Sequence, residues 1–290
     1  MLPTTVETKC STLGCQNKAT SRCTGCRDAT PPTVYCSSDC QKRDWIFHKK
    51  YCGKKAYTFD MTLVGSRDPV ITRSFEVPSW YTFQELHYTL QYAMGPWQCT
   101  HLHEFSFRGE RDPFTYNDDE KLKILPRYLY EDDFGFSMPG QPAVPKEWEE
   151  KLLLSDVFDP RGRLHGKVVQ DGEISPLMYT YDFGDCWEHE LKYKGEKLAR
   201  EARPLFTSAQ GCGPIEDCGS ISGWEDVKAA FRVPAAQRTS EQRYKVQWAK
   251  DVSGLGDACD PFKEPDVVQM NYEGRWENHL QAYKLASARA

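Results

Sequence analysis

The sequence has no apolar run that approaches the roughly 20 residues a membrane-spanning helix needs. Its N-terminal stretch, MLPTTVETKC, also lacks the apolar segment of a secretory signal peptide. We therefore expect a cytoplasmic or nuclear protein with no membrane partner. Disulfide bonds are rare in those reducing compartments, so dense cysteines favour metal binding over the alternative of a disulfide framework.

A strong excess of basic residues is also absent, since the net charge is -5. Residues 1–55 do carry ten basic and four acidic side chains, a local net charge of +6, which leaves -11 for the rest of the chain. If the seven cysteines of this segment bound two divalent metal ions as thiolates, the charge would change by -7 and +4 to +3, which is a weak footprint for a phosphate backbone. Nucleic acid is disfavoured as a partner, although a mobile-element-related nucleic-acid-binding protein remains an alternative.

Two catalytic arrangements are missing as well. The tripeptide Asp182-Phe183-Gly184 matches the kinase DFG in letters alone, because the sequence has no Gly-rich loop, no HRD and no matching lysine strand. We also find no serine or tyrosine recombinase arrangement. Neither activity is therefore expected of this chain.

Cysteine, by contrast, is abundant and clustered: of twelve cysteines, seven lie in the first 52 residues. Zinc binds sulfur at about 2.3 Å and nitrogen at about 2.0 Å, so its four ligands must meet within a few ångströms. The ligand-type residues of this segment make two tetrahedral sets of four, and they are Cys10, Cys15, Cys23, Cys26, Cys36, Cys40, His48 and Cys52.

The stretch CSSDCQKRDWIFHKKYC, residues 36–52, shows that these sets interleave. If the stretch is mostly helical, the pairs Cys36/Cys40 and His48/Cys52 each share a helical face. Cys40 and His48 are eight residues apart, a rise of about 12 Å, so they cannot share an ion. Each of two ions must then recruit two upstream ligands, and spacing alone leaves open which upstream pair joins which.

The ordered ligands and the segment CQKRDW resemble the MYND-type zinc finger over residues 10–52. The first cysteine pair is spaced more widely, and residues 27–35 form a longer loop, than is usual in that family. The resemblance implies two structural zinc ions, one on Cys10, Cys15, Cys36 and Cys40 and the other on Cys23, Cys26, His48 and Cys52.

The same resemblance implies that the module binds short proline-rich peptides, in a groove lined by Gln41 and Trp45. A Trp face packs well on a preformed proline-rich segment, and a Gln side chain bonds its free carbonyl groups. In the alternative interpretation, Trp45 is a core residue packed against Ile46 and Phe47.

A different pattern begins near residue 55. Residues 57–63 alternate apolar and polar side chains, which predicts a strand, and residues 71–78 predict a second one that ends at Pro78. Residues 82–94 predict a helix with a capping box of Thr82 and Glu85, and a further helix is expected with Ser222 as its cap. Residues 101–109 are strand-like, and residues 178–195 predict two short strands joined at a turn of Gly184 and Asp185.

Three segments, SFEVPSWYTFQELHYTLQYAMGPWQCTHLHEFSF, YDFGDCWEHEL and CGPIEDCGSISGWEDV, resemble in order the plasmid pRiA4b ORF-3-like family over about residues 57–235. The resemblance implies an α+β domain and no established chemistry. The expected fold class is therefore α+β: a small double-zinc cross-brace module (1–55), then a larger domain (56–290) with a mixed or antiparallel sheet and flanking helices. Residues 109–175 are expected to form an insertion of loops with short helices, and the residues after about 235 a C-terminal extension.

The larger domain also offers a possible second site. His101 and His103 would share one face of a strand, while Asp182, Asp185 and His189 gather about the predicted turn. Such side chains bind metals or transfer protons, but near turns they often only bond the backbone. Glu216 and Asp217 lie in a Gly-rich loop with Cys212 and Cys218, which weakly suggest a third zinc ion or a disulfide.

From the sequence, the main hypothesis is that the protein is an adaptor without catalytic activity. Its MYND module would recognise a protein or a proline-rich peptide. A hydrolase-like or metal-dependent enzyme acting at His101, Asp185 and His189 is the alternative.

Overall fold

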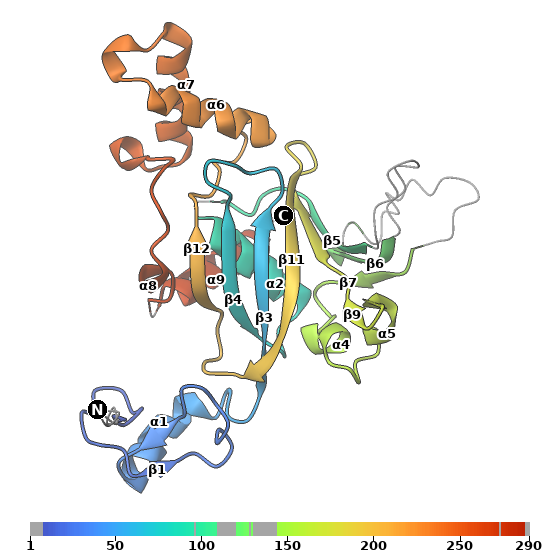
Figure 1. Ribbon diagram of the computed structural model, residues 1–290, viewed down its shortest axis with the longest axis vertical. Coiled ribbons are helices and arrows are strands. Elements are labelled where there is room, and N and C mark those ends of the chain that lie inside the picture. The colour runs from blue at the N-terminus through green and yellow to red at the C-terminus, as the bar shows by residue number, and fades with distance from the viewer. Residues whose placement is uncertain are drawn as a thin grey trace, which may run out of the picture.

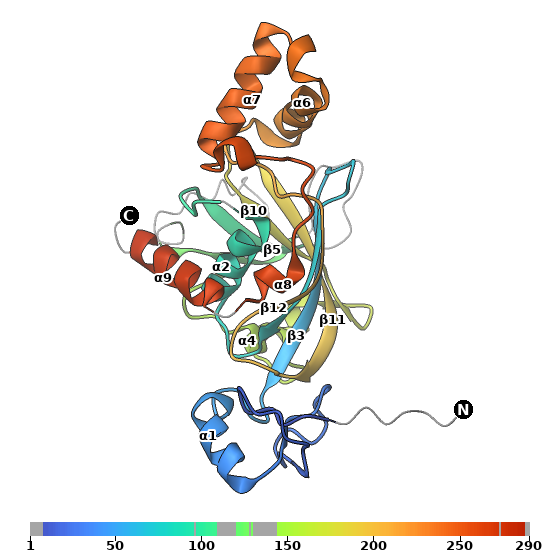
Figure 2. The same ribbon diagram turned by 90° about the vertical axis from the view of Figure 1, so that its left-hand side faces the viewer.

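The computed structural model describes residues 8–95, 97–108, 120–127, 129, 144–272 and 274–287. Figure 1 shows a small N-terminal module at one end of the long axis, a twisted sheet with helices in the middle, and a helical hairpin at the opposite end. Figure 2 shows the same order from the side. None of the helices in these residues combines the length and the apolar character that crossing a membrane requires.

The N-terminal module consists of a short hairpin and one helix. Strands β1 (Ser21–Arg22) and β2 (Val34–Tyr35) pair antiparallel, and helix α1 (Ser38–His48) follows. The Ser37 hydroxyl caps α1 by accepting a hydrogen bond from the N–H of Cys40 at 3.2 Å.

Helix α1 covers the middle of residues 36–52 and leaves out both ends. Cys36 comes directly before Ser37, the cap of the helix. Cys52 lies in the turn after the helix, and its N–H donates to the His48 carbonyl at 2.9 Å. Of the four ligands of residues 36–52, Cys40 and His48 lie within the helix, while Cys36 and Cys52 flank it, and the stretch is mostly helical. The separation of Cys40 from His48 along one helix is as predicted.

The larger domain is built on an eight-stranded sheet with the order β12-β4-β3-β11-β10-β5-β6-β7. Neighbours pair antiparallel except β6 and β7, which are parallel, so the sheet is mixed. Its strands are β3 (Lys55–Leu63), β4 (Thr72–Pro78), β5 (His103–Arg108), β6 (Glu120–Leu125), β7 (Lys146–Trp148), β10 (Leu177–Tyr181), β11 (Trp187–Leu198) and β12 (Leu205–Gln210). A separate hairpin is formed by β8 (Val169–Gln170) and β9 (Glu173–Ile174).

The predicted strands β3 and β4 are present, and a turn at residues 182–186 joins β10 to β11 as expected, although β11 is long rather than short. The prediction of only loops and short helices for residues 109–175 was wrong, because β6 and β7 extend the sheet there. Leu122 and Ile124 alternate with lysines on β6 and are buried, a strand pattern hidden by the charged neighbours. Residues 109–119, 128 and 130–143 of the expected insertion lie outside the described residues.

Helix α2 (Phe83–Met94) has the predicted capping box: the Thr82 hydroxyl accepts from the N–H of Glu85 at 3.2 Å, and the Glu85 carboxylate accepts from the N–H of Thr82 at 3.0 Å. The helix is buried on nearly all sides, since it contacts the sheet on one side and α9 (Arg275–Ser287) on the other. Tyr88 of α2 stacks on Tyr283 of α9 with ring centroids 5.7 Å apart.

Helix α6 begins at Ser220, with Gly219 as its cap at φ 92°, so the prediction of Ser222 as the cap was wrong. Gly219 adopts the left-handed conformation that a glycine allows, and the Ser222 hydroxyl donates to its carbonyl from inside the first turn. The remaining helical segments are α4 (Leu154–Phe158), α5 (His165–Val168), α6 (Ser220–Arg232), η1 (Ala235–Gln237), α7 (Ser240–Val252), η2 (Gly256–Ala258) and α8 (Val267–Met270).

The buried side chain of Arg73 connects several elements of the larger domain through hydrogen bonds. Arg73 on β4 is 1% exposed, and its guanidinium donates to the carbonyls of Ala93 at 2.8 Å, Thr72 at 2.8 Å, Gln210 at 2.7 Å and Gly211 at 3.0 Å. It therefore connects the end of α2 to the end of the edge strand β12. Burial lowers the pKa of Arg73 to about 10, which leaves the side chain charged at neutral pH.

Candidate functional site

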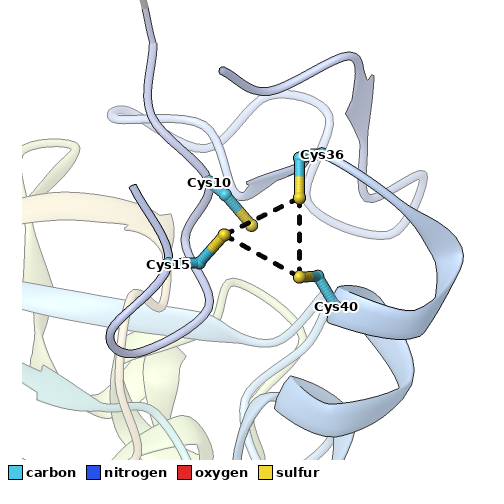
Figure 3. Close-up of side chains that lie close together, drawn as sticks. All are labelled: Cys10, Cys15, Cys36 and Cys40. Carbon is cyan, nitrogen blue, oxygen red and sulfur yellow. Dashed lines mark hydrogen bonds between the residues drawn. The ribbon is translucent and has the colours of Figure 1, made fainter. Parts of the chain in front are cut away.

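Four cysteine sulfurs converge beside the start of α1 (Figure 3). The Sγ atoms of Cys15 and Cys36 are 3.7 Å apart, those of Cys36 and Cys40 3.5 Å, and those of Cys15 and Cys40 3.9 Å. Cys10 completes the group, whose four sulfurs all lie within 4.8 Å of one another. Sulfurs bonded tetrahedrally to zinc at 2.3 Å stand about 3.8 Å apart, so this set fits a zinc ion.

A second set gathers at the other end of α1. His48 Nε2 lies 3.3 Å from the sulfur of Cys23 and 3.5 Å from that of Cys26, and the sulfur of Cys52 lies 3.6 Å and 3.8 Å from the same two atoms. An imidazole nitrogen and a thiolate sulfur on one tetrahedral zinc ion are about 3.5 Å apart. Burial lowers the pKa of His48 and so favours the neutral ring that binds metal.

The electrostatics of the tetrads require a cation. Arg43 donates to the Cys40 sulfur at 3.0 Å and lowers the pKa of that thiol to about 6. Burial and the neighbouring thiols of Cys23 and Cys26 instead raise the pKa of Cys52 to about 12. Four ligands can be deprotonated together only when a positive ion offsets their mutual repulsion. The two tetrads thus fit two structural zinc ions, with every position filled by the protein.

The side chains expected to bind a peptide project from α1 between the two tetrads. Trp45 is 45% exposed, and Ile46 and Phe47 are each 58% exposed, so the interpretation of Trp45 as a core residue packed on these two is wrong. The Trp45 ring lies tilted against His48, with centroids 5.8 Å apart. Gln41 is half-buried one turn earlier, on the same face of the helix as Trp45.

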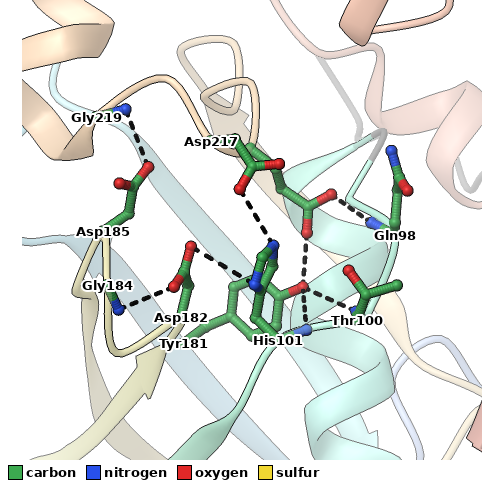
Figure 4. Close-up of polar contacts among 10 residues, drawn as sticks. Gln98, Thr100, His101, Tyr181, Asp182, Gly184, Asp185, Asp217 and Gly219 are labelled. Carbon is green, nitrogen blue, oxygen red and sulfur yellow. Dashed lines mark hydrogen bonds and ion pairs between the residues drawn. The ribbon is translucent and has the colours of Figure 1, made fainter. Parts of the chain in front are cut away.

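A second polar cluster lies where three loops meet beyond β10 (Figure 4). His101 stands between two carboxylates: its Nδ1 is 3.8 Å from an Asp182 oxygen and its Nε2 is 3.4 Å from an Asp217 oxygen. Asp182 follows β10 directly, and its other oxygen accepts a hydrogen bond from the N–H of Gly184 at 2.9 Å. His101 and Asp182 are largely enclosed, whereas the Asp217 side chain is 64% exposed.

A buried tyrosine and glutamate hold these loops together. The Tyr181 hydroxyl donates to Glu216 at 2.6 Å and accepts from the N–H groups of Thr100 and His101 at 3.2 and 3.4 Å. The second oxygen of Glu216 accepts from the N–H of Gln98 at 2.7 Å. Burial raises the pKa of Glu216. The residues that directly precede Asp182 and Asp217 thus fix the backbone that carries His101.

A model of the plasmid pRiA4b ORF-3-like protein family matches residues 55–262, the segment that contains this cluster. The chain belongs to this family. A model of the MYND finger matches residues 9–52, which hold both tetrads, so the N-terminal module is a MYND-type zinc finger.

Two relatives of this pRiA4b ORF-3-like protein have no assigned role. The uncharacterized protein y4hQ of Sinorhizobium fredii is 30% identical over 210 residues, which cover 72% of this chain and 88% of the relative. The crystal structure of a protein of unknown function from Methanosarcina mazei Go1 is 27% identical, with a TM-score of 0.51, and the similarity covers 76% of this chain and 98% of that one.

Within the pRiA4b ORF-3-like domain, the other predicted site residues have separate partners. His101 precedes β5, which begins at His103, so the prediction that both lie on one strand was wrong. His103 is buried, 2.8 Å from the Glu149 carboxylate, with its ring stacked on His87 at 3.6 Å. His189 is fully buried on β11, and its Nδ1 lies 3.3 Å from the Tyr179 carbonyl.

Asp185 accepts a hydrogen bond from the N–H of Gly219 at 3.0 Å, at the cap of α6. Among the described residues, the group of possible metal ligands around His101 contains Asp182 and Asp217 but neither Asp185 nor His189. The sequence identifies Asp217 only as a loop residue, since its approach to His101 spans more than a hundred residues and leaves no local pattern.

Cys212 and Cys218 supply neither of the suggested features. All twelve cysteines are described and none is disulfide-bonded. The two side chains pack partly buried against the core, and burial raises their pKa values to about 11 and about 12. Neither cysteine joins a group of possible metal ligands within the described chain.

Proposed function

We propose that this protein is a zinc-binding adaptor whose MYND-type finger recognises a proline-rich peptide or protein partner through Gln41 and Trp45. The main support for this proposal is that Trp45 is exposed on a helix that is held near both ends by zinc-ligand sets. Cys40 directly precedes Gln41, and His48 comes three residues after Trp45. An exposed aromatic side chain on so constrained a helix would lose little conformational freedom on binding, which supports this role for Trp45.

Physical considerations favour a proline-rich occupant. A polyproline II segment has little conformational freedom to lose on binding and leaves its carbonyl groups unbonded. An indole face offers area for the proline rings, and a neighbouring amide can donate to those carbonyls. Aromatic residues of this kind carry a large share of binding energy at many interfaces, often 2 kcal/mol or more when truncated.

The test is a binding measurement with the full-length, zinc-loaded protein. A panel of fluorescent proline-rich peptides, with scrambled sequences that lack proline, would be titrated against the wild type and against Gln41→Ala/Trp45→Ala. We expect binding by the wild type and a loss of at least about tenfold in the double variant. Lys42→Ala, an exposed change on the same helix, is the matched control and should bind as the wild type does. Equal binding by the double variant, with both zinc ions retained, would refute the proposal.

A further inference from the structure

We propose that His101, Asp182 and Asp217 form a third metal site, which binds a divalent cation such as Mn²⁺ or Zn²⁺ and remains open to solvent. The site lies in the larger domain, and the proposal does not depend on peptide binding by the MYND finger. Its ligand set differs from that of the tetrads, since it combines one imidazole with two carboxylates.

The spacing of the three side chains carries the inference. A charge-assisted hydrogen bond between an imidazolium and a carboxylate measures about 2.7–2.9 Å. His101 instead stands farther from both carboxylates, with its Nε2 3.4 Å from an Asp217 oxygen and its Nδ1 3.8 Å from an Asp182 oxygen. The three side chains therefore point toward one another at distances longer than such hydrogen bonds. One ligand atom from each lies within 4.8 Å of the other two.

The distance from each ring nitrogen of His101 to the carboxylate that faces it is similar to the distances between zinc ligands in the same chain. The ligand pairs described above for the two tetrads lie between 3.3 Å and 3.9 Å apart. Nitrogen and oxygen ligands at 2.0–2.2 Å from an ion stand about 3.0 to 3.6 Å apart, for octahedral and tetrahedral geometry respectively. An ion binds only one ring nitrogen, so it would take Nδ1 beside Asp182, and the exposed Asp217 side chain can turn from Nε2 to complete the set.

The surroundings hold the ligands in the manner of a metal site. One oxygen of Asp182 is bonded to the N–H of Gly184, which leaves the other directed at His101. The buried hydrogen bond between Tyr181 and Glu216 fixes the residue before each carboxylate. Hydrogen bonds of this kind orient ligands and strengthen metal affinity in known sites.

The ligand types indicate the class of ion. Imidazole suits Zn²⁺ and other first-row transition ions, and paired carboxylates also suit Mn²⁺. Three protein ligands leave at least one coordination position for water, unlike the closed thiolate tetrads. The exposed Asp217 gives an ion a path of entry from solvent.

The test is a titration of the full-length, zinc-loaded protein with Mn²⁺, followed by electron paramagnetic resonance, which separates free from bound Mn²⁺. Thiolates retain zinc against the harder Mn²⁺, so the tetrads do not compete for this probe. A parallel calorimetric titration with Zn²⁺ counts any equivalent beyond two. We expect one further ion per chain, and an affinity at least about tenfold lower in Asp217→Asn and in His101→Gln.

Asp185→Asn is the matched control, because it removes a neighbouring negative charge and keeps an oxygen that can accept from Gly219. Its metal affinity should stay within about twofold of the wild type. The proposal is overturned if neither ion binds at concentrations up to about 1 mM, which would make the cluster an ion pair only. Undiminished binding in Asp217→Asn, or an equal loss in Asp185→Asn, would also overturn it.

Discussion

Cys40 and His48 lie on the same helix, α1, and belong to different metal-binding tetrads. Eight residues of helix separate them by about 12 Å, so each end of α1 is tied to its own set of upstream cysteines. The helix has few buried residues of its own, namely the two ligands, and apolar packing alone cannot hold it in place. Metal binding is accordingly the main source of order in this module.

Zinc removal should unfold the module and spare the rest. Structural zinc in small fingers contributes about 10–16 kcal/mol of apparent binding free energy, more than so small a cluster of buried residues can replace. A strong chelator is expected to collapse the NMR amide dispersion of residues 10–52, while the amides of the eight-stranded sheet keep their shifts. Persistent dispersion of the finger signals without zinc would contradict this.

Gly25→Ala should selectively weaken the second tetrad. A Cβ atom at Gly25 would lie 2.8 Å from the Cys52 sulfur, so this metal ligand would have to move. We expect metal analysis to find about one tightly held zinc ion per chain instead of two. Gly166→Ala serves as the control, since that glycine is exposed with open space around an added Cβ, and it should retain both ions.

Trp45→Ala should leave the fold intact. The side chain is 45% exposed, and truncations at such positions usually change the free energy of unfolding by less than about 1 kcal/mol. The zinc content and the thermal midpoint are expected to stay near the wild-type values. A variant that lost zinc would instead give Trp45 a structural role.

Arg73→Met should strongly destabilise the larger domain. The variant keeps much of the side-chain volume, but four backbone carbonyls lose their shared donor, some of them in buried surroundings. A buried acceptor left unpaired costs about 1–3 kcal/mol, so a total loss of about 3 kcal/mol or more is expected from urea denaturation. The matched control is Lys192→Met, a change at an exposed lysine on another strand of the same sheet, which should change stability little.

His189 should make the larger domain sensitive to acid. Burial lowers the pKa of His189 to about 4, whereas an imidazole in the unfolded chain titrates near 6.5. Between these values the unfolded state binds more protons, so this contribution to stability is present above pH 6.5 and is lost as the pH falls toward 4. The loss amounts to roughly 3 kcal/mol.

The comparison of wild type with His189→Phe isolates this effect, because the other histidines titrate in both proteins. The phenyl ring retains aromatic contact with Trp97, which lies 5.6 Å from the imidazole in edge-to-face geometry. Urea unfolding at pH 7 and pH 4.5 should show a smaller acid-induced loss of stability in the variant. Parallel losses in the two proteins would count against His189 as the source.

Local sequence patterns predicted the structure correctly wherever the residues that determine it are close together in the sequence. The alternation in β3, the capping box of α2 and the spacing along α1 each depend on residues within about one turn or one strand of each other. Predictions failed where distant segments decide the outcome. Strands β6 and β7 are stabilised by pairing at the edge of the sheet, and α6 begins at Ser220 because Asp185 of another loop bonds the N–H of its capping Gly219.

The sequence by itself determined that this chain carries two interleaved zinc sites, because fixed ligand spacing on a helix of known rise permits no single shared ion. It also determined the family of each part, through ordered motifs. Only the tertiary structure decided which side chains meet beyond β10. His101, Asp182 and Asp217 are brought together by chain crossings and by a buried tyrosine–glutamate hydrogen bond, and such long-range contacts leave no periodic trace in the sequence.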